Sequence, residues 1–143
     1  MNKGFTIIEL IIVITIVTIV FAISIAAYDR FLSSGVLDSA KFEIIQNIRS
    51  AQILAISGKD NLNYGVFITE NQYTVYQGAS YLNRTISQDK VFVLPNNIRA
   101  SGLAEINFAK KTGLPNTTGT LILTHTTNNS KENITINTTG LIF

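Results

Sequence analysis

The sequence predicts an α+β fold in which one long N-terminal helix packs on a small antiparallel β-sheet domain. Three observations lead to this prediction. The chain starts with a long apolar run, continues with apolar residues at helical spacing, and ends in short β-like runs separated by turn residues. Its 143 residues leave room for one modest domain and an anchor, and not for two full cores.

The N-terminal apolar run is long enough to cross a bilayer. Leu10–Tyr28 contains no charged residue and no proline, and as a helix it would extend about 28 Å, close to the ~30 Å hydrocarbon thickness. Lys3 precedes the run, and the mixed pair Asp29 and Arg30 follows it, which favours an N-terminus that stays in the cytoplasm. We therefore expect a transmembrane helix over 5–28 and an exported remainder.

Three interpretations of this segment stay open: a cleaved signal peptide, a plain membrane anchor and an assembly helix. Ser24, Ile25 and Ala26 form a small-x-small site that supports cleavage before Ala27. However, the run exceeds the usual length of a signal-peptide core, and the carboxylate of Glu9 stands near its start. An acidic residue at a bilayer centre costs roughly 2.5–3.5 kcal/mol, so we interpret Glu9 as functional.

The residues around Glu9 resemble the processing site of type IV prepilins and type II secretion pseudopilins. The resemblance rests on the stretch KGFTIIE, residues 3–9, followed by the apolar run. It implies that a prepilin peptidase removes the leader 1–4 by cleaving after Gly4, and that the new terminal residue, Phe5, is N-methylated. A positive amine at Phe5 would then lie one turn before the negative charge of Glu9.

Pairing between subunits would explain why Glu9 is tolerated. Inside a bundle of apolar helices each charge is costly alone, but the Phe5 amine of one subunit and Glu9 of the next offset each other. We therefore assign Glu9 to assembly and axial register. Glu9→Ala is expected to leave membrane insertion intact and to reduce incorporation into filaments.

The resemblance also implies partners and a location. The partners are a prepilin peptidase, other pilin or pseudopilin subunits, membrane lipid, and indirectly an assembly ATPase with its membrane platform. The precursor would cross the cytoplasmic (inner) membrane once, with its N-terminus inside and its head domain periplasmic or extracellular, before assembly into a filament.

The helical pattern continues beyond the apolar run, over 29–57. Gly35 is expected to weaken the join, and Gly58 is expected to end the helix. A helix over Phe5–Ser57 would be roughly 80 Å long, and its outer half must pack its apolar stripe on something. A coiled-coil partner is the alternative to a β domain, but the stripe is short for a heptad assignment. The stripe consists of Leu37, Ala40, Ile44, Ile48, Ala51 and Ala55, with Ile45 beside them.

Residues 58–143 form the predicted β-rich head domain. Glu70-Asn71 is expected to form a tight hairpin turn, and Thr126–Glu132 a polar loop. The predicted strands are Asn63–Thr69, Gln72–Gln77, Lys90–Leu94, Glu105–Ala109, Gly119–His125 and Asn133–Asn137, with Gly140–Phe143 as a further edge strand.

A weaker resemblance concerns the subgroup. Arg49-Ser50-Ala51-Gln52 near the end of the helix, Gly113 before a strand and Gly140 near the C-terminus resemble the GspH/FimT-type minor pseudopilins. The resemblance implies a minor subunit. The sequence leaves open whether the filament serves secretion, DNA uptake, or adhesion and motility.

Composition gives no support for an enzyme, a cofactor or a metal site. The chain has no cysteine, and His125 is its only histidine, so thiolate and histidine-based sites are excluded. Beyond Asp89 the only acids are Glu105 and Glu132, which argues against a calcium loop. No phosphate loop or nucleophile motif is present. We predict a structural subunit, with His125 as a polar residue at a strand end.

A nucleic-acid surface is the minority alternative, alongside an exported binding domain with an ordinary signal or anchor. The net charge of +2 is too small to indicate it, and the adjacent pair Lys110-Lys111 is the best candidate contact for a competence-type pilin. A solvated face explains such scattered charges better. The other residues of the candidate surface are Arg84, Lys90, Arg99, Tyr64, Tyr73, Tyr76 and Tyr81.

Overall fold

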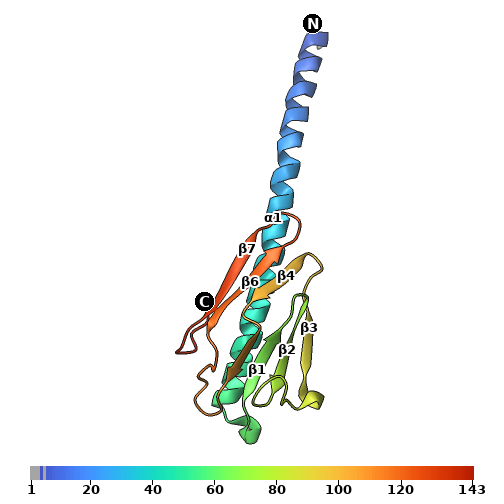
Figure 1. Cartoon of the computed structure of the whole chain (residues 1–143). Coiled ribbons are helices and arrows are strands. Elements are labelled where there is room, and N and C mark those ends of the chain that lie inside the picture. The colour runs from blue at the N-terminus through green and yellow to red at the C-terminus, as the bar shows by residue number, and fades with distance from the viewer. Residues whose placement is uncertain (1–3, 5) are drawn as a thin grey trace. The chain divides into compact units, whose positions relative to one another are not determined.

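The computed structural model (Figure 1) describes Gly4 and residues 6–143, with side chains described everywhere in that range except 23–33. The chain divides into two compact units, residues 1–34 and Gly35–Phe143, and each is considered by itself. The helix α1 (Ile7–Ile56) contributes to both units. The second unit combines its part of α1 with antiparallel sheets, which confirms the α+β class.

The part of α1 in the second unit buries the apolar stripe that the sequence predicts. All six stripe residues from Leu37 to Ala55 are 5% exposed or less. The helix continues through Gly35 and ends at Ile56, one residue before the predicted end. Gly58 follows with a φ of 64°, the left-handed conformation in which glycine commonly terminates a helix. The carbonyl of Ala55 accepts hydrogen bonds from the N–H groups of Gly58 and Lys111, so the helix end is tied to the β domain.

Seven strands form two antiparallel sheets within the described residues. The first sheet has the order β3-β2-β1-β5 and the second has the order β4-β6-β7, and Figure 1 shows both beside the lower part of α1. The strands are β1 (Tyr64–Ile68), β2 (Gln72–Gln77), β3 (Lys90–Val93), β4 (Ile98–Gly102), β5 (Glu105–Phe108), β6 (Gly119–His125) and β7 (Lys131–Ile136).

The strand predictions hold for six elements and are wrong for two. The bounds of β2 and β6 match the prediction residue for residue, while β1, β3, β5 and β7 differ by one or two residues at their ends. The strand β4 was not predicted, because Ile98-Arg-Ala-Ser-Gly102 contains only one good strand former. This strand forms because every residue of β4 pairs with a residue of β6, from Ile98↔His125 to Gly102↔Leu121.

The predicted edge strand Gly140–Phe143 is instead a single bridge, Ile136↔Ile142. Thr135 and Phe143 exchange both of their backbone hydrogen bonds, at 2.8 and 3.1 Å. The chain before this bridge is a turn built on Asn137, whose side-chain oxygen accepts the N–H groups of Thr139 and Leu141. Because Asn137 to Leu141 form this turn, they are not available to extend the bridge into a strand.

The core lies between α1 and the sheet faces that turn toward it. Val66 of β1, Ile106 of β5 and Leu121 of β6 are fully buried there with the helix stripe. The other face of the first sheet is covered by the connection between β2 and β3, where the ring of Tyr81 stacks on Phe67 with centroids 3.9 Å apart. The head therefore has apolar contacts on both faces of this sheet.

Candidate functional site

The predicted cleavage position lies outside the helix. Gly4 is exposed and not helical, and α1 begins at Ile7. A side-chain carbon placed on Gly4 would meet no atom within 4 Å. Phe5, the predicted methylation site, and Lys3 lie outside the described residues. An accessible, non-helical peptide is what a protease needs, because helical backbone hydrogen bonds must otherwise be broken before cleavage.

Thr6 caps the start of α1. Its side-chain oxygen accepts the N–H of Glu9 at 3.3 Å, and its carbonyl accepts the N–H of Leu10 at 3.1 Å. Thr6 and Glu9 have the spacing of a capping box, with threonine at the N-cap and glutamate at the third helical position. The sequence analysis missed this role, although the signal Thr-x-x-Glu before an apolar run was present.

Removing the cap is expected to loosen the first turn of α1. Thr6→Ala should destabilise that turn by about 1 kcal/mol, so amide hydrogen exchange at Glu9 and Leu10 should become about fivefold faster. The measurement is hydrogen exchange on the full chain in a lipid bicelle, with Thr6→Ser as the control that retains the cap. Equal exchange in Thr6→Ala and the wild type would contradict the capping role.

Glu9 stands in the first turn of α1, surrounded by apolar residues. It is exposed, and no cation of the described residues lies within ion-pairing distance of it. Its negative charge lies near the N-terminus of the helix, where it interacts favourably with the positive end of the helix dipole. The apolar residues of this part of the helix are 46–80% exposed; they are Ile7, Ile8, Leu10, Ile11, Ile12, Val13, Ile14, Ile16, Val17, Ile19, Val20 and Phe21.

The hydroxyl groups in this stretch bond to their own backbone. Thr15 donates to the carbonyl of Ile11 and Thr18 to that of Ile14, both at 2.8 Å. Apart from the carboxylate of Glu9, the exposed surface of α1 from Ile7 to Phe21 is therefore mainly apolar. Among the described residues, no helix is both long and apolar enough to cross a membrane. The predicted span Leu10–Tyr28 extends into 23–33, whose side chains lie outside the description.

The residues behind the subgroup resemblance come together in the head. The side-chain amide of Gln52 donates to the carbonyls of Gly113 at 3.1 Å and Gly140 at 3.0 Å. One turn earlier, Arg49 donates to the carbonyl of Ile142 at 3.2 Å. These contacts form a clamp that ties α1 to the turn before β6 and to the C-terminal segment. Both glycines have positive φ, 66° and 80°.

Three of the four tyrosines of the candidate nucleic-acid surface are buried. Tyr64, Tyr73 and Tyr76 are 6% exposed or less, and burial, followed by the hydrogen bond to Glu43, raises the pKa of Tyr73 well above its usual range. None of these rings is free to stack on a base, which is the main contact that single strands use. Lys110 and Lys111 remain exposed on a turn.

Tyr81 and Arg84 are also engaged within the head. The guanidinium of Arg84 lies 3.7 Å from the centroid of the Tyr81 ring and pairs with Asp89 at 2.7 Å. A nucleic acid would have to displace these contacts. The four tyrosines and Arg84 are therefore engaged in contacts within the protein, while Lys90, Lys110 and Lys111 are exposed.

His125 ends β6, as the sequence predicts, and is 3% exposed. Its Nδ1 accepts the N–H of Thr127 at 3.3 Å, and its Nε2 lies 3.0 Å from the side-chain amide of Asn97. Both ring nitrogens are thus used inside the protein. Over the part of the chain that the structure describes, no group of three potential metal ligands is close enough to hold an ion.

Comparison with known proteins adds one match, at the N-terminus. Residues 1–25 match the family model described as the prokaryotic N-terminal methylation motif. No curated protein and no solved structure matches the chain. The matched segment includes Gly4, Thr6 and Glu9, whose geometry is given above.

Proposed function

We propose that this protein is a structural subunit of a type IV pilus or of a type II secretion-like filament. The N-terminal methylation motif supports this proposal, because it indicates a type IV pilin-like or pseudopilin chain that a prepilin peptidase processes. The observation that carries the proposal is an exposed, non-helical Gly4 shortly before a capped helix whose exposed side chains, apart from Glu9, are mainly apolar.

Processing would occur between Gly4 and Phe5. The capped helix starts at Ile7, so cleavage at this bond would leave Phe5 as a short extension before the Thr6 cap. Methylation of the Phe5 amine would keep its positive charge. This charge would lie at the positive end of the helix dipole, which disfavours it, so a carboxylate partner is needed once the surroundings are apolar.

Assembly would supply that carboxylate from a neighbouring subunit. Glu9 is exposed and unpaired among the described residues, and its neighbours Ile8 and Leu10 are 64% and 55% exposed. Packing these residues against other subunits would remove Glu9 from water, and an isolated buried carboxylate is costly. Pairing with the Phe5 amine offsets this cost and sets the axial register of adjacent helices.

The second unit would form the exported head. The clamp of Gln52 on Gly113 and Gly140 supports a minor subunit of the GspH/FimT type, because it joins the three sequence features on which that resemblance rests. The proposed partners are a prepilin peptidase, other pilin subunits, the inner-membrane lipid, and an assembly ATPase with its platform.

Mass spectrometry of the N-terminal peptide of the native protein tests the proposal. The expected result is a chain that begins at N-methylated Phe5. A chain that begins at Ala27 would instead identify a signal peptide, and one that retains Met1 would identify a plain anchor. Either of these results contradicts processing after Gly4.

A further inference from the structure

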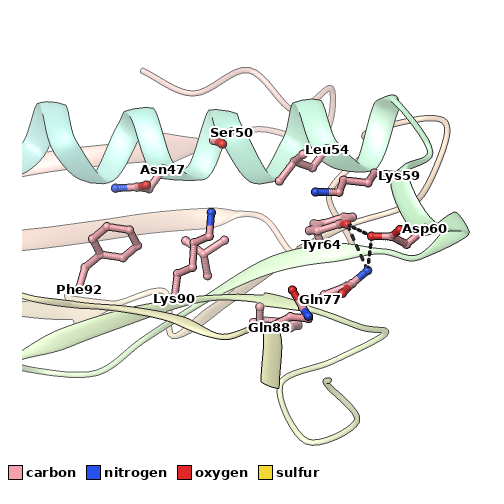
Figure 2. Close-up of a pocket in the computed structure, with 12 residues that line it drawn as sticks. Asn47, Ser50, Leu54, Lys59, Asp60, Tyr64, Gln77, Gln88, Lys90 and Phe92 are labelled. Carbon is pink, nitrogen blue, oxygen red and sulfur yellow. Dashed lines mark hydrogen bonds between the residues drawn. The ribbon is translucent and has the colours of Figure 1, made fainter. Parts of the chain in front are cut away.

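A pocket of about 140 Å³ lies between α1 and the first sheet of the head (Figure 2). All of its lining residues belong to the second unit, so it is independent of the filament role proposed above. A cavity of about 150 Å³ is large enough to hold benzene, so this pocket fits a small organic group. It is lined by Asn47, Ser50, Leu54, Lys59, Asp60, Tyr64, Val75, Tyr76, Gln77, Gln88, Lys90 and Phe92.

Two lysines contribute positive charge to the pocket. Lys90 is the first residue of β3 and stands opposite Val75, which in turn stands opposite Val66 of β1. This register places Lys90 on the face of the sheet that turns toward α1, where it is exposed at the mouth of the pocket beside Val75 and Phe92. Figure 2 shows its amino group pointing toward the helix near Ser50, and the amino group of Lys59 on the same side of the sheet.

Neither lysine has a partner within the head. The side chains of Lys59 and Lys90 form no hydrogen bond or ion pair with any residue that the structure describes. The nearby carboxylate of Asp60 accepts hydrogen bonds from Tyr64 at 3.1 Å and from Gln77 at 2.9 Å. Two ammonium groups and one carboxylate leave a formal charge of +1 at the pocket.

The remaining walls are both apolar and polar. Leu54, Val75 and Phe92 are half-buried and pack against the hydrophobic core, so they offer an apolar surface next to the lysines. The hydroxyl of Ser50 also lines the pocket. A fully polar anion would make no use of the apolar wall, whereas an uncharged apolar group would leave the net charge of +1 at the pocket without a counter-charge.

We propose that this pocket binds a carboxylate attached to a short apolar group. The carboxylate takes its hydrogen bonds from Lys59 and Lys90, and the apolar group lies against Leu54, Val75 and Phe92. The carboxylate comes from either of two sources, a free organic acid or a glutamate side chain of a polypeptide. Both present the same chemistry to the pocket.

An NMR titration of the full chain in neutral bicelles tests the chemistry. Sodium 3-methylbutanoate is the probe, and its uncharged analogue 3-methylbutanamide is the matched control. The acid is expected to cause saturable shifts at the amides of Ser50, Val75 and Lys90, with at least about tenfold tighter binding than the amide compound. Equal affinity for the two compounds, or shifts that do not saturate, would overturn the proposal.

Lysine variants test the location. Lys90→Gln and Lys59→Gln are each expected to weaken binding of 3-methylbutanoate by about tenfold. Lys110→Gln removes an exposed lysine outside the pocket and should change affinity less than about twofold. Spectra of the unliganded variants establish that each is folded. A Lys110→Gln effect as large as that of Lys90→Gln would mean nonspecific attraction and would refute the site.

A peptide pair separates the two sources. The acetylated and amidated tripeptide Val-Glu-Val is compared with Val-Gln-Val. Binding of the glutamate peptide at the same amides, and its loss in Lys90→Gln, would identify a polypeptide side chain as the source. Binding of 3-methylbutanoate alone would identify a free acid, and binding of neither would overturn the proposal.

Discussion

Glu9→Gln is expected to remove most of the chain from filaments while leaving processing at Gly4 and the amount of protein in the membrane unchanged. Glutamine is also found at the third helical position of capping boxes, so the substitution is expected to retain the start of the helix. It cannot neutralise the Phe5 amine of a neighbouring subunit. An unpaired buried charge costs about 3–5 kcal/mol, or at least about a hundredfold in the assembly equilibrium. The measurement is the ratio of mature subunit in sheared filaments to subunit in the membrane.

Two further variants separate charge from capping. Glu9→Asp keeps the charge and should assemble better than Glu9→Gln. Thr6→Ala keeps Glu9 and weakens the cap, so its assembly defect should be the smaller one. Wild-type incorporation of Glu9→Gln would contradict the pairing and would leave Glu9 only its local role at the start of α1.

Gly113→Ala is expected to lower the free energy of unfolding of the head by about 1–2 kcal/mol. Gly113 has a φ of 66°, a conformation that costs an L-residue about 1–2 kcal/mol. A side-chain carbon there would also collide with the side chain of Ile56. Ile56 is 49% exposed, so its side chain can rotate to relieve this contact, and the backbone conformation supplies most of the expected loss. Denaturant unfolding of the full chain in detergent, followed by near-ultraviolet circular dichroism, measures the change.

Gly35→Ala is the matched control for this substitution. Gly35 lies inside α1, and a side-chain carbon there would meet nothing within 4 Å. Alanine is therefore expected to stabilise the helix by about 0.5–1 kcal/mol. Gly113→Asn tolerates the backbone conformation but keeps the collision, so it separates the two causes. Unchanged stability of Gly113→Ala would show that neither cause operates.

The processing segment shows how far local sequence signals reach. The motif around Gly4 and Glu9 is contiguous, so residue order alone could predict it, and the family match covers the same segment. The capping role of Thr6 was also readable from the spacing to Glu9. Cleavage at Gly4, methylation of Phe5 and pairing of Glu9 remain predictions, because they depend on an enzyme and on a second subunit.

The candidate nucleic-acid surface shows the opposite case. Tyr73 and Tyr76 lie on the same strand, β2, but their side chains face opposite sides of one sheet. The hydroxyl of Tyr73 donates to Glu43 at 2.8 Å, and the hydroxyl of Tyr76 accepts the side-chain amide of Asn107 at 3.0 Å. A list of residue types cannot distinguish an exposed ring from one that completes a buried network.

By itself, the sequence determined the helix, its buried stripe, its end shortly before Gly58 and most strand positions, because periodicity and turn residues act over a few neighbouring residues. Only the tertiary structure decided that β4 exists, that Gln52 holds Gly113 and Gly140, and that Lys90 faces a pocket beside Ser50. Each of these depends on residues tens of positions apart, and the free energy of their contacts arises only when the whole head packs.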